Sequence, residues 1–358
     1  MIKDQYKIIG IMSGTSLDGI DLVYCNIEKN ECWSFQIIMA ETIPYTKEWK
    51  KKLQNATHLS ENKLQDLNEK YTEYLSDVIN NFIDNISDFT EIDAVCSHGH
   101  TVLHQPEKGL TLQIGNFPQI AENIRQTVVC DFRVQDVMLG GQGAPLVPIG
   151  DQLFFSDYDY CLNIGGFANV STEKNSQRIA YDICPVNIVL NYLSEKLGFD
   201  YDSEGKIASK GTLIPEWLEN LNKIAFYGQL PPKSLGLEWV QKHIFPYLNK
   251  SNHKVEDLLH TFTEHVAQQL TQNFEENSNV LITGGGAYNK YLIQRIKSLK
   301  NLEIIIPEKQ LIEYKEALVF GLLGVLKLRG EINCLKSVTG AKTDHSSGVI
   351  FLYKNNNF

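Results

Sequence analysis

The sequence has little that would place the protein in a membrane or outside the cell. Its longest nearly apolar run, residues 317–326, is far shorter than the roughly 18 residues that a membrane-spanning helix needs. The first residues lack the basic-then-apolar pattern of a secretion signal, and the seven cysteines form no C-x-x-C pair. We therefore expect a cytoplasmic protein whose cysteines are reduced, buried thiols.

The sequence also has fewer basic than acidic residues. The chain has 33 Lys and Arg against 43 Asp and Glu, which gives a net charge of −10. Nucleic acids and anionic membranes bind basic surfaces, so this balance argues against both as main partners. A small phosphate ligand stays compatible with it, because backbone N–H groups can hold an anion without a charged side chain.

Strand-like runs alternate with amphipathic segments along the chain. Apolar residues at spacings of three and four predict helices over residues 61–82, with Ser60 as the cap, and over residues 255–274. Shorter helices are expected over residues 118–125, 290–300 and 316–328. This alternation predicts an α/β fold.

The length of 358 residues fits one large or two ordinary domains. The glycine-rich segment 138–150 has no helical period and is interpreted as a crossing between domains. We therefore expect a first domain of residues 1–140 together with the tail 336–358, and a second domain of residues 141–335.

Each half of the chain opens with a glycine-containing turn between two strands. The first is SGTSLDG, residues 13–19, and the second lies within NIGGFAN, residues 163–169. Such a turn can present successive backbone N–H groups to a phosphate, and the hydroxyls of Thr15 and Ser16 add donors. The alternative is an ordinary hairpin with an Asp-Gly turn.

A third glycine segment, TGGGAYN (residues 283–289), follows an apolar strand and precedes a helical pattern. Without side chains there, a flat base could lie against the backbone, or a phosphate against the helix N-terminus. The alternative is a plain strand-to-helix turn. Together, the three segments favour a bound polyphosphate, with Asp18 or Asp21 orienting a magnesium ion or its waters.

These segments resemble the phosphate and adenosine segments of the actin, Hsp70 and sugar-kinase superfamily, and more closely those of the anhydro-N-acetylmuramic acid kinase family. The motifs run in order along the chain: GIMSGTSLDGID, SHGHTVLHQP, TLQIGN, DFR, LGGQGAPLVP, LNIGGFAN, TGGGAYN and SVTGA. The resemblance implies a two-domain actin-like (ribonuclease H-like) ATPase fold with an interdomain cleft. It implies a kinase that uses ATP, Mg²⁺ and water to convert 1,6-anhydro-N-acetylmuramic acid into N-acetylmuramic acid 6-phosphate, in peptidoglycan turnover.

The same resemblance implies a set of site residues. ATP contacts are expected from Gly14, Thr15, Ser16, Leu17, Asp18, Gly19, Ile20, Asp21, Asn163, Gly165, Gly166, Gly284, Gly285 and Gly286. Sugar contacts are expected from His98, His100, Arg133, Asn187 and Glu316. No residue is expected to bind a metal directly, since magnesium arrives with ATP and Asp18 is the nearest candidate to it.

Asp182 is the candidate general base, because ring opening requires a group that takes a proton from the water attacking the anomeric carbon. Its alternative role is a helix N-cap. Where the family has D-T-G-P-G-N, this chain has DICPVN, residues 182–187. The loss of two glycines leaves two other functions open: a kinase for another anhydro or amino sugar, and a nucleotide-binding protein without catalysis.

The remaining candidates also have simpler alternatives. His98 and His100, two apart on a strand, are expected to point the same way and to form hydrogen bonds rather than join His104 in a metal site. Arg133 could hold the lactyl carboxylate of the sugar or form a surface ion pair. Glu316 could face the sugar or place charge in a first helical turn. The expected partner is a small sugar, and the oligomeric state stays open, with a homodimer as one option.

Overall fold

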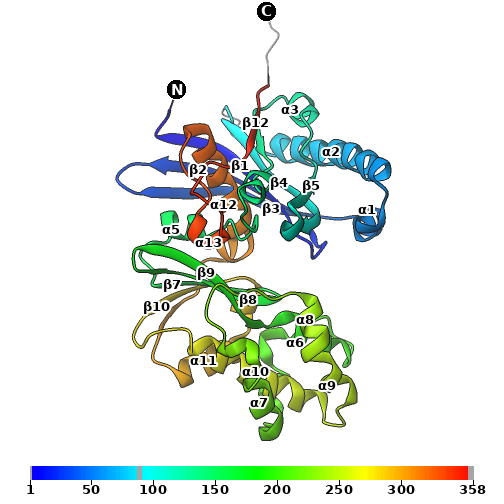
Figure 1. Ribbon diagram of the computed structural model, residues 1–358, viewed down its shortest axis with the longest axis vertical. Helices are drawn as coiled ribbons and strands as arrows, with labels where there is room; N and C mark the ends of the chain where they lie inside the picture. The colour runs from blue at the N-terminus through cyan, green and yellow to red at the C-terminus, as the bar shows by residue number, and fades with distance from the viewer. Residues whose placement is uncertain (1, 87–90, 354–358) are drawn as a thin grey trace, which may run out of the picture. The chain divides into compact units, whose positions relative to one another are not determined.

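A computed structural model describes residues 2–86 and 91–353 (Figure 1). The chain divides into two compact units, Met1–Phe154 with Tyr314–Phe358, and Phe155–Glu313. As in the expected domains, a C-terminal stretch joins the first unit, but the crossings follow residue 154 rather than 140 and residue 313 rather than 335. The segment 138–150 therefore lies within the first unit.

The described strands of the first unit form one seven-stranded sheet. They are β1 (Gln5–Ser13), β2 (Gly19–Lys29), β3 (Trp33–Pro44), β4 (Ala94–Gln105), β5 (Leu110–Ile114), β6 (Val128–Cys130) and β12 (Val349–Phe351). The order is β12-β6-β4-β1-β2-β3, with β5 paired to β4. β1, β2 and β3 form an antiparallel meander, whereas β4 and β6 run parallel to β1 and end at the same edge.

Helices of the first unit pack on both faces of this sheet. They are α1 (Lys47–Gln54), α2 (Glu61–Asp84), α3 (Gln119–Ile124), α4 (Val134–Met138), α5 (Pro148–Phe154), α13 (Lys336–Thr339) and the part of α12 (Lys309–Arg329) from Tyr314 onward.

Strand β1 is buried on both faces, which explains its nearly continuous apolar sequence. Ile9 and Ile11 share a core with the α2 stripe, including Tyr71. On the other face Gly10 meets α12: a Cβ on Gly10 would lie 2.0 Å from the Ala317 carbonyl oxygen. Glycine at this position therefore lets the helix backbone lie directly on the strand.

The second unit repeats the same strand arrangement. Its described strands, β7 (Tyr160–Ile164), β8 (Phe167–Lys174), β9 (Gln177–Pro185), β10 (Asn279–Thr283) and β11 (Glu303–Ile305), have the order β11-β10-β7-β8-β9. Here too the first three strands are antiparallel and the next two are parallel to the first. This order matches β6-β4-β1-β2-β3, so the predicted actin-like (ribonuclease H-like) α/β fold is confirmed.

Six longer helices accompany these strands in the described part of the second unit: α6 (Asn187–Glu195), α7 (Pro215–Asn222), α8 (Leu237–His243), α9 (Phe245–Lys250), α10 (Val255–Thr271) and α11 (Lys290–Leu299). Short 3-10 turns across both units lie at Ala56–His58, Pro106–Lys108, Ser203–Gly205, Ala208–Lys210, Ala225–Gly228 and Gly285–Tyr288.

The predicted helices are found, with different ends. The helices expected over residues 61–82 and 255–274 correspond to α2 and α10. Ser60 occupies the N-cap position of α2, but its side chain makes no capping hydrogen bond. The helix expected from residue 316 starts seven residues earlier, at Lys309. Residues 309–315 alternate charged residues with Leu311, Ile312 and Tyr314, and the continuous apolar run begins only at Ala317, so this start was not predicted.

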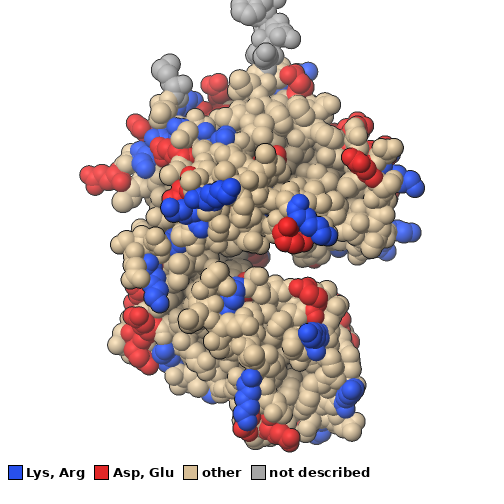
Figure 2. Space-filling model, viewed as in Figure 1, with Lys and Arg blue, Asp and Glu red and all other residues tan. Residues whose placement is uncertain are grey.

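The surface is mixed in charge. On the face drawn in Figure 2, Lys and Arg side chains are interspersed with Asp and Glu. Among the helices that are described, none is both long enough and apolar enough to cross a membrane. All seven cysteines are free thiols, and all but Cys32 are buried.

Replacing Gly10 with Ala should destabilise the first unit by about 1–3 kcal/mol, because the new Cβ overlaps the backbone of α12. Urea unfolding of the purified protein measures this loss. Gly14→Ala is the matched control, since its Cβ would meet nothing closer than 3.4 Å. Equal midpoints for the two variants would contradict the close packing of β1 on α12.

Candidate active site

The loop after β1 carries the first predicted phosphate segment. Residues 14–18 connect β1 to β2, and the Leu17 N–H donates to the Gly14 carbonyl at 3.3 Å. Leu17 has a φ of 62°, a strained conformation of the kind that gathers at functional loops. Both Thr15 and Ser16 are exposed, and within the described residues their backbone N–H groups donate no hydrogen bond. The loop can offer these groups to an anion.

The glycines of this segment differ in what they permit. A Cβ on Gly19 would lie 2.5 Å from the Ile43 carbonyl oxygen, so packing of β2 on β3 requires glycine there. A Cβ on Gly14 would have only the Ser16 hydroxyl nearby, at 3.4 Å. Ile20 is fully buried in the core, so only its backbone is near the loop. Gly14 is thus the glycine whose absent side chain leaves room for a ligand.

Strand β4 contains a bulge that separates the two predicted histidines. Gly99, with a φ of 73°, lies where the pairing of β4 with β1 shifts. The ring of His98 packs on Phe320 of α12, with centroids 4.7 Å apart, whereas His100 packs on Tyr71 of α2, at 6.0 Å. The prediction that both rings point the same way is therefore wrong, because the extra residue of a bulge reverses the alternation of side chains.

Hydrogen bonds fix the His98 ring and the Arg133 guanidinium together. His98 Nδ1 lies 2.9 Å from the Gly99 carbonyl, which assigns the proton to Nδ1, and Nε2 accepts from Arg133 Nε at 2.7 Å. Arg133 Nη1 donates to the Gly143 carbonyl at 2.7 Å. Burial holds the pKa of His98 well below its usual value and lowers the pKa of Arg133 to about 10. Arg133 stays charged at neutral pH and is no surface ion pair.

Glu316 of the first unit interacts electrostatically with Arg133 and with Asp21. Glu316 keeps access to solvent, yet desolvation raises the pKa of its carboxyl, Arg133 opposes this, and Asp21 raises the pKa further. Asp21 also accepts a hydrogen bond from the Thr42 hydroxyl at 2.6 Å. Because α12 begins at Lys309, Glu316 lies beyond the first helical turn, and its alternative role there is excluded.

The second predicted phosphate turn is tied to the start of a helix. Gly165 and Gly166 join β7 to β8, and the Gly166 carbonyl accepts from the N–H groups of Val186 and Ile188 at 2.8 and 3.3 Å. The Gly165 carbonyl accepts from the Asn187 N–H at 3.3 Å. A Cβ on Gly165 or Gly166 would stay 3.6 or 3.9 Å from its nearest neighbour. The turn is therefore anchored by its carbonyls and open around its Cα atoms.

Asp182 lies in β9, a few residues before this anchor. It pairs with Asn169 of β8, where a bulge shifts the register. Its N–H donates to the Lys233 carbonyl at 3.0 Å, and its Oδ2 accepts from the Leu235 N–H at 2.7 Å. Burial raises the pKa of Asp182, and the Leu235 hydrogen bond partly offsets this. The N-cap of α6 is Val186, so the alternative that Asp182 caps this helix is excluded.

The two residues that replace family glycines are not exposed beside Asp182. Cys184 and Val186 are both 0% exposed and belong to the hydrophobic core of the second unit. Their side chains fill the interior, so they add no surface to a ligand site. The DICPVN segment therefore changes the packing beneath Asp182 more than the surroundings of its carboxylate.

The three glycines after β10 also divide into two kinds. A Cβ on Gly284 would lie 2.6 Å from Asn163 Oδ1, and one on Gly286 would lie 2.2 Å from Ile164 Cγ2. Packing against β7 therefore requires both. Gly285 faces open space, since its Cβ would approach nothing closer than 4.0 Å.

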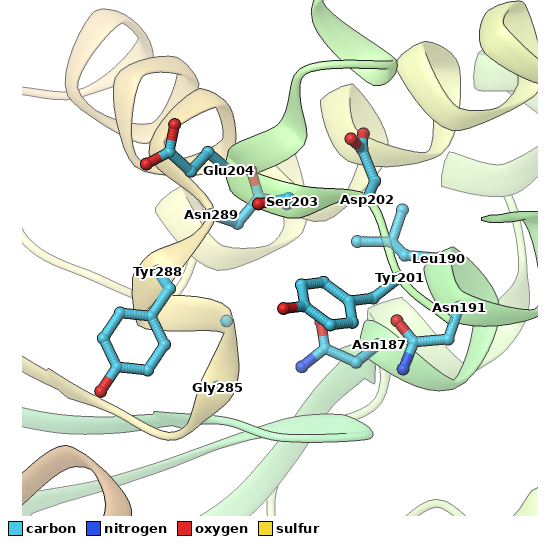
Figure 3. Close-up of a pocket in the computed structure, with 11 residues that line it drawn as sticks. Asn187, Leu190, Asn191, Tyr201, Asp202, Ser203, Glu204, Gly285, Tyr288 and Asn289 are labelled. Carbon is cyan, nitrogen blue, oxygen red and sulfur yellow. The ribbon is translucent and has the colours of Figure 1, made fainter. Parts of the chain in front are cut away.

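A pocket of about 450 Å³ opens beside Gly285 (Figure 3). Gly285 and Gly286 line one part of it, and the Tyr201 ring projects into it near Asn187 and Asn191. A bare backbone and an aromatic ring in one pocket suit a flat ligand. Asn187, predicted to contact the sugar, thus lines the same pocket as two predicted ATP glycines.

Other polar side chains of this pocket already have partners. Asp202 accepts from the N–H groups of Ile207 and Ala208, both at 2.8 Å, and its carboxylate points away from the pocket in Figure 3. Asn289 caps α11 by accepting from the Leu292 N–H at 3.0 Å. Because Asn289 and a 3-10 turn occupy the start of α11, a base against Gly285 fits better than a phosphate at the helix N-terminus.

Three residues of these sites were not predicted from the sequence: Tyr201, Asn191 and Leu235. Tyr201 lies in a segment without helical or strand period, and its exposed aromatic ring among polar neighbours was the available signal. Asn191 follows Asn187 by one helical turn on α6, which a search along that helix face would have found. Leu235 acts through its backbone N–H, which no side-chain pattern reveals.

One group of side chains in the described chain, Asp136, Cys334 and His345, has the composition of a metal site. Its geometry is that of a hydrogen-bond hub. Asp136 Oδ1 accepts from the Cys334 thiol at 3.0 Å and the Thr339 hydroxyl at 2.7 Å, and Oδ2 accepts from a backbone N–H at 2.7 Å. These bonds satisfy the buried carboxylate and attach the C-terminal segment to the first unit.

Each unit has the same ribonuclease H-like sheet with an open glycine turn, and the second unit has a glycine-lined pocket that suits a flat ligand. These features define the protein class: the fold is an actin-like ATPase fold of the sugar-kinase kind. The particular family follows from the sequence profile of Anhydro-N-acetylmuramic acid kinase, which matches residues 6–353. The chain belongs to that family.

Relatives with the family name match the chain almost from end to end. The Francisella tularensis subsp. novicida protein named Anhydro-N-acetylmuramic acid kinase is 36% identical, with 95% of this chain and 97% of the relative aligned. The Sulfurimonas denitrificans protein of the same name is 31% identical over 96% and 98%. Among solved structures, an activator of 2-hydroxyisocaproyl-CoA dehydratase from Clostridium difficile with bound ADPNP is 15% identical, with 90% of this chain and 97% of that chain aligned and a TM-score of 0.41.

The His100 ring should stay neutral until the pH falls to about 4, because burial lowers its pKa to that value. The unfolded chain binds this proton near pH 6.5, so the group disfavours the folded state progressively as the pH falls from 6.5 towards 4. Titration of the ring followed by NMR measures the midpoint. A midpoint near 6.5 would contradict the burial of His100, whose Nδ1 lies 2.9 Å from the Ser13 hydroxyl and whose ring packs on Tyr71.

Proposed function

We propose that this chain catalyses the ATP-dependent conversion of 1,6-anhydro-N-acetylmuramic acid and water into N-acetylmuramic acid 6-phosphate and ADP. Membership of the family over residues 6–353 carries the proposal. The position of Asp182 supports it, because this half-buried carboxylate lies on β9, which leads into the start of α6, where three N–H groups bind the turn of Gly165 and Gly166.

The chemistry divides into two linked steps. Asp182 takes a proton from water as the water oxygen attacks the anomeric carbon, and the bond from that carbon to O6 breaks. O6 then bonds to the γ-phosphorus of ATP, and the bond to the β-phosphate oxygen breaks to release ADP. A carboxylate with a raised pKa suits the first step, since it binds the proton more readily than an exposed aspartate does.

Arg133 is the proposed partner of the lactyl carboxylate of the sugar. Nε and Nη1 are already held by His98 and Gly143, which fixes the plane of the guanidinium. Nη2 makes no hydrogen bond within the described residues, so its N–H groups remain to donate to a carboxylate. His98 stays neutral and accepts from Arg133, and it therefore positions Arg133 rather than competing with it for the anion.

The pocket beside Gly285 is the proposed site of the adenine base. Its backbone side and the Tyr201 ring would contact the two faces of the base, while Asn187 or Asn191 would contact its polar edge. The open N–H groups of Thr15 and Ser16 and the turn of Gly165 and Gly166 are the proposed phosphate contacts.

Magnesium is the proposed ion that accompanies ATP. Asp18 fits this role through water, because its exposed carboxylate accepts no hydrogen bond in the described part of the chain. The ion would neutralise charge on the phosphates during transfer. A cytoplasmic location and a homodimer remain sequence-based proposals, which fractionation and light scattering would test.

Asp182→Asn should lower sugar-dependent ADP formation by about two to four orders of magnitude, because the amide cannot act as the base. A coupled ADP-release assay with and without 1,6-anhydro-N-acetylmuramic acid measures it. Asp157→Asn, an exposed aspartate of the same unit, is the control and should keep full activity. Near-normal turnover by Asp182→Asn would remove Asp182 from this role.

The same assay separates the other candidate functions. ADP formed only with a different anhydro or amino sugar would indicate another substrate. Binding of ATP without turnover on any sugar of the panel would indicate a non-catalytic homologue. The buried positions of Cys184 and Val186 favour the first function over both, since neither replacement adds surface beside Asp182.

Gly285→Val should raise the KM for ATP by about tenfold or more, because the side chain would fill the space proposed for the base. The fold should survive, since a Cβ at this position meets no atom closer than 4.0 Å. Gly228→Val is the matched control, because its Cβ also faces open space and lies outside the pocket. An unchanged KM for ATP in a folded Gly285→Val protein would place the base elsewhere.

A further inference from the structure

The Asp182 carboxylate is held by a loop that the sequence patterns do not mark. β9 is the edge strand of its sheet, and the chain just before α8 runs along its outer side. The Lys233 carbonyl accepts from the Asp182 N–H at 3.0 Å, and two residues later the Leu235 N–H donates to Asp182 Oδ2 at 2.7 Å. The loop thus contacts both the backbone and the side chain of one residue.

Because of this contact, the two oxygens of the Asp182 carboxylate differ in their hydrogen bonding. Oδ2 is the acceptor of the Leu235 N–H, whereas Oδ1 accepts no hydrogen bond from any residue that the structure describes. A carboxylate held through one oxygen has a defined rotamer and presents the other oxygen in a fixed direction. The bulge at the pairing of Asn169 with Asp182 further sets the direction in which the side chain leaves the strand.

Among the residues that the structure describes, no charged side chain holds the Asp182 carboxylate, whose pKa is shifted by burial and by the Leu235 hydrogen bond. The Cys184 thiol on β9 interacts electrostatically with Asp182 and with Lys233 of the loop, and Tyr227 interacts in turn with Cys184. Cys184 is buried as a neutral thiol, because burial raises its pKa. The Lys233 ammonium lies over the Phe226 ring at 4.8 Å from its centroid and contacts the Phe226 carbonyl at 3.5 Å. The Lys233 ammonium therefore interacts with Phe226.

We propose that the loop of Lys233, Ser234 and Leu235 is the positioning element of the catalytic base, with the Leu235 N–H holding Oδ2 so that Oδ1 receives the proton of the attacking water. The inference rests on the proposed function, in which Asp182 is that base. Leu235 touches neither water nor sugar in this role, so it is a positioning residue. Its donor is a backbone group, so the identity of its side chain is secondary.

Leu235→Pro removes this one donor. The N–H favours the ionised carboxylate, so its loss should move the acidic limb of the kcat/KM profile to higher pH by about one unit. The control is Leu237→Pro, two residues further on: position 237 is the first residue of α8, where proline is tolerated, and Gly236 before it is already extended. This control should keep the wild-type profile.

A second variant tests the same hydrogen bond in case the Leu235→Pro protein does not fold. Replacing the Leu235 amide with an ester, by incorporation of the α-hydroxy analogue of leucine, removes the N–H and keeps the side chain. Both variants should show the upward shift, with thermal unfolding confirming that each is folded. A folded ester variant with an unshifted acidic limb would overturn the inference. The control for the underlying proposal is Asp182→Asn: if that protein keeps its activity, the assignment of the base fails, whatever Leu235 does.

Discussion

The placement of the candidate base depends on hydrogen bonds between a two-glycine turn and the first residues of a helix. The carbonyls of Gly165 and Gly166 accept from three successive N–H groups, those of Val186, Asn187 and Ile188. These bonds join the turn between β7 and β8 to the start of α6, and Asp182 lies on β9, the strand that precedes α6. One turn thus serves two purposes: its carbonyls anchor the base-bearing segment, and its open Cα positions leave space for a ligand.

Much of the fold could be predicted because its signals are periodic. The stripe of α2, the doubly buried β1 and the glycine turns all follow from residue spacing. The opposed directions of His98 and His100 could not be predicted, because a single left-handed residue, Gly99, reverses the alternation, and glycine alone does not reveal its φ. The start of α12 was predicted too late, because its first turns mix charged residues with Leu311 and Ile312 and the continuous apolar run begins only at Ala317.

The glycines show how structure separates motif residues that sequence treats alike. Gly10, Gly19, Gly284 and Gly286 are required by close packing within their own units, whereas a Cβ on Gly14, Gly165, Gly166 or Gly285 would meet nothing closer than 3.4 Å. In the second group, packing does not explain why the residue is glycine, and the missing side chain leaves room for a ligand. By the same reasoning, Cys184 and Val186 belong to the core, so the departure of DICPVN from the family pattern lies beneath the site rather than in it.

The central claim is that water opens the anhydro bridge while ATP phosphorylates the released O6. The most direct test is mass spectrometry of the products formed from 1,6-anhydro-N-acetylmuramic acid and ATP in ¹⁸O-labelled water. The account predicts a sugar phosphate that has gained one labelled oxygen on the sugar and none in its phosphoryl group. Labelled inorganic phosphate with the anhydro sugar recovered intact would contradict it.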